Sequence, residues 1–358
     1  MSTSWRPPPS RDGGSRKRPE GARGGDLPPH PFAPFLENQG FVVLDGGLAT
    51  ALEDRGYDLR DPLWSARVLL DDPGAVRSMH LEYLAAGADC ITTATYQATV
   101  AGLGARGLDG AGAEAVLRRG VALAAEAREL FWAEAPNRAG RLRPLVAAGI
   151  GPYGAYLANG AEYTGEYDLD EEGLVAWHRR RWHVLAAAGA DLLACETIPS
   201  LAEVRALVRL AAESPDRWFW MSFQCRDGAL LADGTPVGEA ARACEAAANA
   251  AAVGVNCVPP VHVAALLERL SLESSKPLLA YPNSGESYDA GARRWVGRDG
   301  EEGGSGTSYS PPHGSTVQTP PAAHALRWRA LGAVAVGGCC RTGPEDIRAV
   351  RRALTRSS

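Results

Sequence analysis

From residue 41 onward, short continuous apolar runs alternate with longer stretches that are rich in alanine and carry charged residues. Continuous apolar runs are typical of parallel strands buried on both faces, whereas half-exposed strands alternate apolar and polar residues. We therefore expect eight strands, over residues 41–47, 88–95, 144–151, 190–197, 218–225, 252–258, 276–283 and 333–340. Helices are expected between them, over residues 74–86, 111–134, 170–188, 201–214, 236–251, 261–270, 322–331 and 344–354.

Eight strand–helix repeats predict a closed parallel barrel of the α/β class. The chain has 358 residues. A (β/α)₈ barrel needs about 250 residues and tolerates insertions, so a single TIM barrel fits this length. A doubly wound sheet is the alternative, but it usually has fewer strands and a phosphate-binding loop after the first one.

Two segments interrupt the alternation of predicted strands and helices. Residues 1–37 are rich in Pro, Gly, Arg and Ser, so they bury too little apolar surface to offset the entropy of ordering, and we expect a disordered tail. The barrel should then occupy residues 38–358. Residues 298–321, after the seventh strand, predict a flexible insertion, which is either a plain disordered loop or a lid over the barrel mouth.

Composition argues against several classes of protein. The formal net charge of −5 gives no global basic field for binding nucleic acid. No uninterrupted apolar run reaches the roughly 18 residues that a membrane span needs. The seven cysteines are an odd number, and no secretory signal follows Met1. We therefore expect a cytoplasmic protein whose thiols are free or bound to metal, and its oligomeric state stays open.

Three cysteines lie at the expected carboxyl ends of strands, where such barrels form their active sites. Cys257 closes the sixth strand, and Cys339 and Cys340 close the eighth. Because these ends converge over the barrel mouth, the three thiols (the thiol trio) predict a Zn²⁺ site with Zn–S distances of about 2.3 Å and one open position, as in catalytic zinc sites. The alternatives are three small buried side chains, or a vicinal disulfide between Cys339 and Cys340.

Adjacent residues of a regular strand point to opposite faces of the sheet. Cys339 and Cys340 can therefore share one metal only if the backbone leaves the extended form, and Gly337 and Gly338 would supply that freedom. The remaining cysteines are expected to be small buried side chains: Cys90, Cys195, Cys225 and Cys244.

Three thiolates around zinc suit the activation of a substrate thiol. An aliphatic thiol is mostly protonated at neutral pH, and coordination to zinc would generate the nucleophilic thiolate. The net negative centre would also attract a cationic methyl donor such as a sulfonium. We therefore expect a substrate sulfur to attack a sulfonium methyl group while the protein aligns the two sulfurs.

Several motifs occur together and in order: LDGG at 44–47, GAD at 87–89, TATYQAT at 93–99, GIGPYG at 149–154, ETIP at 196–199, GVNC at 254–257, YPNSGE at 281–286 and GGCCRT at 337–342. With these motifs the chain resembles the homocysteine S-methyltransferase family, in particular the branch that uses S-methylmethionine or S-adenosylmethionine. The resemblance runs from about residue 41 to residue 354.

This resemblance implies a (β/α)₈ barrel in which the thiol trio holds zinc, the homocysteine sulfur fills the open position, and methyl transfer gives methionine. It further implies that Asp45, Gly46 and Gly47 hold the amino-acid end of homocysteine together with Glu196. A carboxylate can pair with the substrate ammonium, and glycine N–H groups can meet its carboxylate.

Other rim residues are candidates for substrate binding. Thr93 and Asn256 would orient substrate or metal ligands. Tyr96, Tyr281 and Asn283 would line the donor pocket, since aromatic faces suit a sulfonium cation.

Three alternatives differ from this expectation. A non-catalytic zinc or thiol barrel, such as a redox sensor or scaffold, would usually close its metal site with four protein ligands. Selenocysteine could replace homocysteine as the acceptor. The GIGPYG motif at 149–154 matches a dinucleotide-binding pattern, but the residues that follow indicate a loop where that pattern requires a helix.

Overall fold

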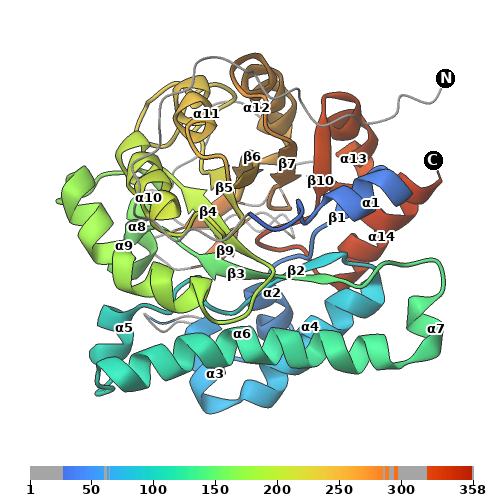
Figure 1. Ribbon diagram of the computed structural model, residues 1–358, viewed down its shortest axis with the longest axis horizontal. Helices are drawn as coiled ribbons and strands as arrows, with labels where there is room; N and C mark the ends of the chain where they lie inside the picture. Colours follow the sequence, from blue (N-terminus) through green and yellow to red (C-terminus); the bar gives the residue numbers. More distant parts are fainter. Residues whose placement is uncertain are drawn as a thin grey trace.

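The structure is a computed structural model that describes residues 27–59, 63, 65–284, 287–289, 294–296 and 321–356. Eight parallel strands form a barrel inside a ring of helices (Figure 1). The strands are β1 (Val42–Val43), β2 (Cys90–Thr92), β3 (Leu145–Ile150), β4 (Leu192–Ile198), β5 (Phe219–Phe223), β6 (Ala250–Asn256), β7 (Leu278–Tyr281) and β10 (Ala333–Val336). The order β1-β10-β7-β6-β5-β4-β3-β2 is closed by a parallel bridge between Leu44 and Cys90, so the predicted TIM barrel is confirmed.

The helices that cover the barrel are α4 (Pro73–Ala86), α6 (Gly110–Ala133), α9 (Glu171–Ala186), α10 (Leu201–Glu213), α11 (Val237–Glu245), α12 (Pro260–Glu273), α13 (Pro321–Ala330) and α14 (Pro344–Thr355). Four of them start where a side-chain oxygen accepts a backbone N–H of the first turn: Asp72, Asp109, Asp170 and Ser200. The helix predicted over 236–251 is too long, because α11 ends at Glu245 and residues from Ala250 onward belong to β6. The run of alanines at the start of β6 favours a helix by intrinsic propensity, but it is buried between β5 and β7 and forms a strand instead.

Shorter elements lie at both ends of the barrel. They are α1 (Ala33–Asn38), α2 (Leu48–Glu53), α3 (Ser65–Asp71), α5 (Val100–Gly104), α7 (Ala135–Arg138), α8 (Tyr153–Leu157), a 3₁₀ turn η1 (Ala161–Tyr163) and an antiparallel hairpin of β8 (Ser287–Asp289) and β9 (Arg294–Val296). No helix of the described residues is long and apolar enough to cross a membrane.

Apolar side chains form two layers. The larger layer lies between the strands and the surrounding helices. The smaller one includes residues such as Leu44, Ala147, Trp220 and Leu279, one from each of several strands, and Phe32 of the N-terminal segment packs with them. Strands with apolar residues on both faces are buried between these layers, which is why their runs are continuous in the sequence.

The N-terminal segment packs across the amino end of the barrel. Phe32, Phe35 and Leu36 are buried, and the Phe32 ring lies 6.4 Å from that of Trp220 between ring centroids. The Trp218 indole N–H donates to the Pro28 carbonyl at 2.8 Å. We call residues 28–38 the barrel floor.

The barrel floor corrects one boundary. The tail was expected to extend to residue 37, but residues 27–37 are part of the packed structure and include most of α1. Three large apolar side chains offset the entropy of ordering this short stretch, although Pro and Gly dominate its surroundings. The rest of the predicted tail, residues 1–26, lies outside the described residues. So does the predicted insertion at 298–321, apart from Pro321, which begins α13.

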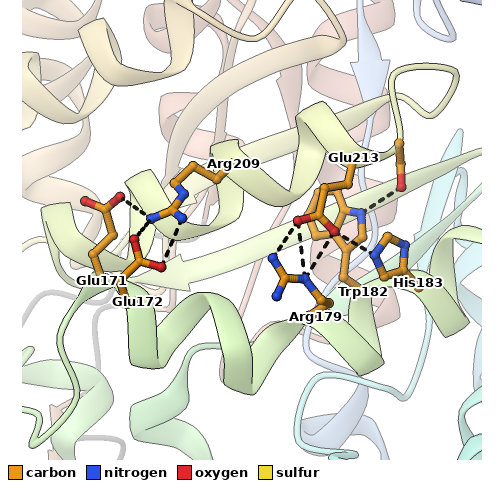
Figure 2. A network of polar contacts seen from close by, with 8 residues as sticks. Glu171, Glu172, Arg179, Trp182, His183, Arg209 and Glu213 are labelled. Carbon is orange, nitrogen blue, oxygen red and sulfur yellow. Dashed lines mark hydrogen bonds and ion pairs between the residues drawn. The ribbon is translucent and has the colours of Figure 1, made fainter. Parts of the chain in front are cut away.

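Helices α9 and α10 are tied together on the outside of the barrel by charged side chains (Figure 2). Arg209 of α10 donates to Glu172 at 2.6 Å and to Glu171 at 3.1 Å. Arg179 of α9 reaches Glu213 at 2.7 Å. These pairs are exposed to water and lie on the outer face of the molecule, so we assign them a modest role in stability and none in chemistry.

Candidate active site

The thiol trio lies at the carboxyl ends of two barrel strands. Cys257 follows β6 directly and has a left-handed backbone conformation with φ of +54°. Cys339 and Cys340 follow β10, which ends at Val336, so the strand predicted over 333–340 is too long. The turn after the strand allows two adjacent cysteines to face the same point, which a regular strand would forbid.

Gly337 and Gly338 permit this turn by their small size. Neither has a positive φ, and the residue of the turn that does is Arg341, at +61°. A Cβ on Gly337 would lie 2.6 Å from the Leu44 Cβ, and one on Gly338 would lie 2.2 Å from the Thr342 Oγ1. The predicted reason, backbone freedom, is therefore wrong here, because close packing is what requires glycine.

The three sulfurs are near enough to share one ion. Their Sγ atoms all lie within 4.8 Å of one another, and those of Cys257 and Cys340 are 3.5 Å apart. Tetrahedral zinc with Zn–S distances of about 2.3 Å separates its sulfurs by about 3.8 Å. Among the described residues the trio is the one group of three metal-ligating side chains this close together. All seven cysteines are free thiols, which rules out the vicinal disulfide in this structure.

Hydrogen bonds within the trio favour one thiolate. The thiols of Cys339 and Cys340 donate to the Cys257 sulfur and hold the pKa of Cys257 well below its usual value. The same shared protons raise the pKa values of Cys339 and Cys340. The hydrogen-bonded trio, with Cys257 and Cys340 buried and Cys339 partly buried, thus supports one negative charge, whereas a divalent ion would allow all three thiols to ionise.

The trio lines a cavity of 570 Å³ at the barrel mouth. Most of the predicted substrate-binding residues line the same cavity: Asp45, Gly46, Gly47, Thr93, Tyr96, Glu196, Asn256 and Tyr281. Asn283 is not brought to it. The Asn283 side chain is buried, and its backbone N–H donates to the Val258 carbonyl at 3.2 Å.

Asp45 is a buried carboxyl held at the end of β1. It accepts the backbone N–H of Thr92 at 2.7 Å and the Thr92 hydroxyl at 3.3 Å. Burial nevertheless raises the pKa of Asp45 to about 7, because these two bonds do not replace the lost hydration of a charge. A bound cation would restore the carboxylate.

Glu196, near the end of β4, is in a similar state. It is buried, and burial raises the pKa of its carboxyl well above the usual value. The Tyr281 hydroxyl donates a hydrogen bond to its Oε2 at 3.4 Å. Two buried carboxyls that have no basic hydrogen-bond partner in the described part of the chain therefore line the cavity.

Asn256 connects the thiol trio to the strands beneath it. Its Oδ1 accepts the Thr197 N–H at 2.7 Å and the Ser222 hydroxyl at 2.8 Å. Its Nδ2 donates to the Thr197 hydroxyl at 2.8 Å and points to the Cys339 Sγ at 3.8 Å. Ser222 in turn contacts the Tyr281 hydroxyl at 2.5 Å. Asn256 thus contacts the Cys339 thiol while its other bonds fix it to the strands.

Two predicted substrate contacts are used within the protein. The Thr93 hydroxyl lies 2.6 Å from that of Thr95 and accepts the Gly149 N–H at 3.0 Å, so it joins β2 to β3. The Gly47 N–H donates to the Thr342 carbonyl at 2.9 Å. Gly47 therefore lines the cavity, but its N–H group is engaged by the backbone.

Sequence reasoning missed Glu162 and Tyr163 of η1, which also line the cavity. The Tyr163 hydroxyl lies 4.0 Å from the Cys257 Sγ. Their segment indicated only a loop, and the structure corrects this expectation in part, because α8 starts at Tyr153 and η1 follows it. Helix α8 has only five residues, so the rejection of a dinucleotide-binding pattern there is consistent with the structure.

The other four cysteines have no place in this site. Cys90, Cys195, Cys225 and Cys244 are buried, and burial raises the pKa of each thiol. Such thiols are poor nucleophiles and pack as small apolar side chains, as predicted.

Known proteins share both the sequence and the fold. A model of the homocysteine S-methyltransferase family matches residues 42–354. The chain is 43% identical over 321 residues to homocysteine S-methyltransferase YbgG of Bacillus subtilis (strain 168), covering 90% of this chain and 96% of that protein. It is 40% identical over 326 residues to a selenocysteine Se-methyltransferase of Brassica oleracea var. italica, covering 89% and 90%.

The fold superimposes on the crystal structure of the homocysteine methyltransferase MmuM from Escherichia coli in its metallated form. The TM-score is 0.77 with 41% identity, over 90% of this chain and 99% of that one. The same eight-stranded barrel thus carries the shared motifs from the first strand to the last helix. The chain belongs to the homocysteine S-methyltransferase family.

Proposed function

We propose that the protein is a zinc-dependent homocysteine S-methyltransferase that uses a sulfonium donor, S-methylmethionine or S-adenosylmethionine. One observation carries the proposal: three sulfur ligands from two strand ends lie within 4.8 Å of one another on the wall of a cavity. A structural zinc site would need a fourth protein ligand, and the trio has none among the described residues. This favours catalysis over a redox sensor or scaffold.

The donor set fits the metal. Three thiols at this spacing suit zinc, which prefers sulfur and nitrogen ligands, and Cys257, Cys339 and Cys340 would hold it. When bound, zinc stabilises the thiolate form of a substrate thiol at neutral pH. Asn256 keeps the Cys339 sulfur oriented through its 3.8 Å contact.

The protein contributes binding and alignment. Asp45 and Glu196 would pair with the ammonium group of homocysteine, which returns both buried carboxyls to their charged form. The homocysteine thiolate then forms a bond to the donor methyl carbon as the carbon–sulfur bond of the sulfonium breaks. That bond's electron pair stays on the donor sulfur, which leaves as a neutral thioether, and the other product is methionine.

A selenocysteine acceptor is the second candidate. It is supported by the 40% identity to the Brassica selenocysteine Se-methyltransferase, and a selenolate suits the same donor set. Homocysteine is favoured because the family model and the other relatives carry that activity in their names.

The test is an assay of purified zinc-loaded protein with each donor and each acceptor in parallel, combined with metal analysis. The Cys339→Ser variant should lose the stoichiometric zinc and at least about 1,000-fold of its activity, because one of three ligands is gone. Cys244→Ser is the matched control, since Cys244 is buried on α11 outside the cavity. Full activity of Cys339→Ser would refute the role of the trio.

A further inference from the structure

Glu162 has no role in the mechanism above, yet it lines the cavity from η1. The segment that carries it is tightly packed. A Cβ on Gly154 would lie 2.4 Å from the Glu162 backbone nitrogen, so α8 and η1 approach each other as closely as glycine allows. Gly160 precedes η1 with a positive φ of +88°, which suits glycine. The backbone of Glu162 is therefore held in place.

One oxygen of the Glu162 carboxyl lacks a partner. Its Oε2 atom is buried and has no hydrogen-bond partner in the part of the chain that the structure describes. Burial raises the pKa of Glu162 to about 7. A buried acceptor without a donor costs free energy, and such groups are rare in folded proteins unless a ligand completes them.

The segment of Glu162 and the segment of Asp45 approach the thiol trio at different cysteines. Its charge raises the pKa values of Tyr96 and Tyr163, after burial, and the Tyr163 hydroxyl lies 4.0 Å from the Cys257 sulfur. The backbone carbonyl of Asp45, in contrast, accepts the Gly338 N–H at 3.0 Å, next to Cys339. The η1 segment thus reaches the trio at Cys257, and the end of β1 reaches it beside Cys339.

We propose that Glu162 binds the cationic methyl donor, at the side of the cavity where η1 approaches Cys257. This inference rests on the proposed function, since it assigns the second substrate of the same reaction. Two amino-acid substrates bring two ammonium groups, and Asp45 with Glu196 accounts for only one of them. A sulfonium amino acid carries one net positive charge, which the unpaired carboxylate of Glu162 complements.

The chemistry gives this arrangement a further use. Transfer of the methyl group turns the sulfonium into a neutral thioether, so the donor loses its net charge in the reaction. Attraction to Glu162 is then stronger for the donor than for the product, which promotes exchange of one for the other.

The experiment is calorimetric titration of S-methylmethionine into the zinc-loaded protein without homocysteine, so that no turnover occurs. Glu162→Gln should weaken binding of S-methylmethionine by about 10- to 100-fold, the worth of a buried interaction with a charged group, and Glu162→Asp should recover part of it. The KM for homocysteine should stay within about twofold, and zinc content and melting temperature should be unchanged.

Glu53→Gln is the matched control, because Glu53 lines the same cavity but faces Arg341 at 4.0 Å. It should leave the affinity for S-methylmethionine within about twofold. Titration with methionine, which keeps the ammonium but lacks the sulfonium charge, distinguishes the two cations. A loss confined to S-methylmethionine assigns Glu162 to the sulfonium, and a loss for both assigns it to the ammonium.

Unchanged binding of S-methylmethionine by Glu162→Gln would overturn the inference, and so would an equal loss of affinity for homocysteine. The proposed function fails separately, if the wild-type protein transfers no methyl group from any sulfonium donor. Binding of S-methylmethionine through Glu162 would still be measurable in that case.

Discussion

The two ends of the barrel differ in the partners that they provide for a buried carboxyl. Asp89, at the amino end, accepts hydrogen bonds from Gln39 at 2.7 Å, from the Val43 N–H at 3.0 Å and from Arg351 at 2.8 Å. Arg141 lies 3.7 Å from its other oxygen. The basic partners there are built into the fold, so this end contributes to stability alone.

At the carboxyl end, Asp45 and Glu196 are buried and Glu162 is partly buried, with no basic side chain hydrogen-bonded to them within the described residues, and the pKa of each is raised. The missing positive charges are those that substrates would bring. The comparison teaches that buried acidic groups mark function where their countercharge is absent and structure where it is present.

The largest effect on stability should come from removing a buried side chain of the barrel floor. Phe32→Ala removes a fully buried ring and should lower the free energy of unfolding by about 3–5 kcal/mol, measured by urea denaturation. The KM for homocysteine should not change, because the cavity is at the other end. Leu272→Ala, at a position that is 82% exposed, is the control and should shift stability by less than about 0.5 kcal/mol. A change in KM with Phe32→Ala would contradict the conclusion that the barrel floor contributes to stability and not to substrate binding.

A second, smaller effect should appear in the pH dependence of stability. The pKa of Asp45 is raised from 3.8 to about 7 in the folded protein, so its proton stabilises the fold at low pH and that stability is lost as pH rises toward 7. Asp45→Asn removes this decline. Relative to wild type, the variant should gain about 2–3 kcal/mol between pH 5 and pH 8 in urea unfolding of the substrate-free protein. Parallel curves for the two proteins would argue against a strained carboxyl at this position.

The smallest effect should be kinetic. Glu196→Gln removes a charge that would pair with the homocysteine ammonium, and kcat/KM for homocysteine should fall by about 10- to 100-fold, or about 1.4–2.7 kcal/mol. Its free energy of unfolding should not fall, because no basic partner is left behind. Asp89→Asn should have the opposite effect. Its free energy of unfolding should fall, and its kcat/KM for homocysteine should be unchanged. If Glu196→Gln instead destabilised the fold and spared the kinetics, Glu196 would be structural.

Much of the barrel could be predicted because its physical causes are local. Each strand is a continuous apolar run, and each cysteine of the thiol trio stands close after such a run. The barrel floor could not be predicted, since the gain from burying Phe32 and Phe35 depends on a partner, Trp220, that is distant in the sequence. The turn that aims Cys339 and Cys340 could be expected, but its dependence on tight packing of Gly337 required the structure.

Glu162 illustrates the limit for the site. Its segment has no apolar period and no motif that assigns a role to an acidic residue. What distinguishes Glu162 from the other described residues of the cavity is a buried oxygen without a partner, which is a property of the folded chain alone. Asp45 and Glu196 were found because the family resemblance pointed to them, whereas the local sequence gave no sign of their raised pKa values.

The segment shared with the family model begins at residue 42, whereas the barrel floor ends at residue 38. A protein shortened to the shared segment would lose the barrel floor, and the Trp220 ring would be exposed to water. Trp220 donates to the Tyr281 hydroxyl at 3.0 Å, and that hydroxyl reaches Glu196. Trimming the chain to the shared segment would therefore remove the packing beneath this chain of hydrogen bonds and lower the stability of the barrel, although every residue of the cavity would remain.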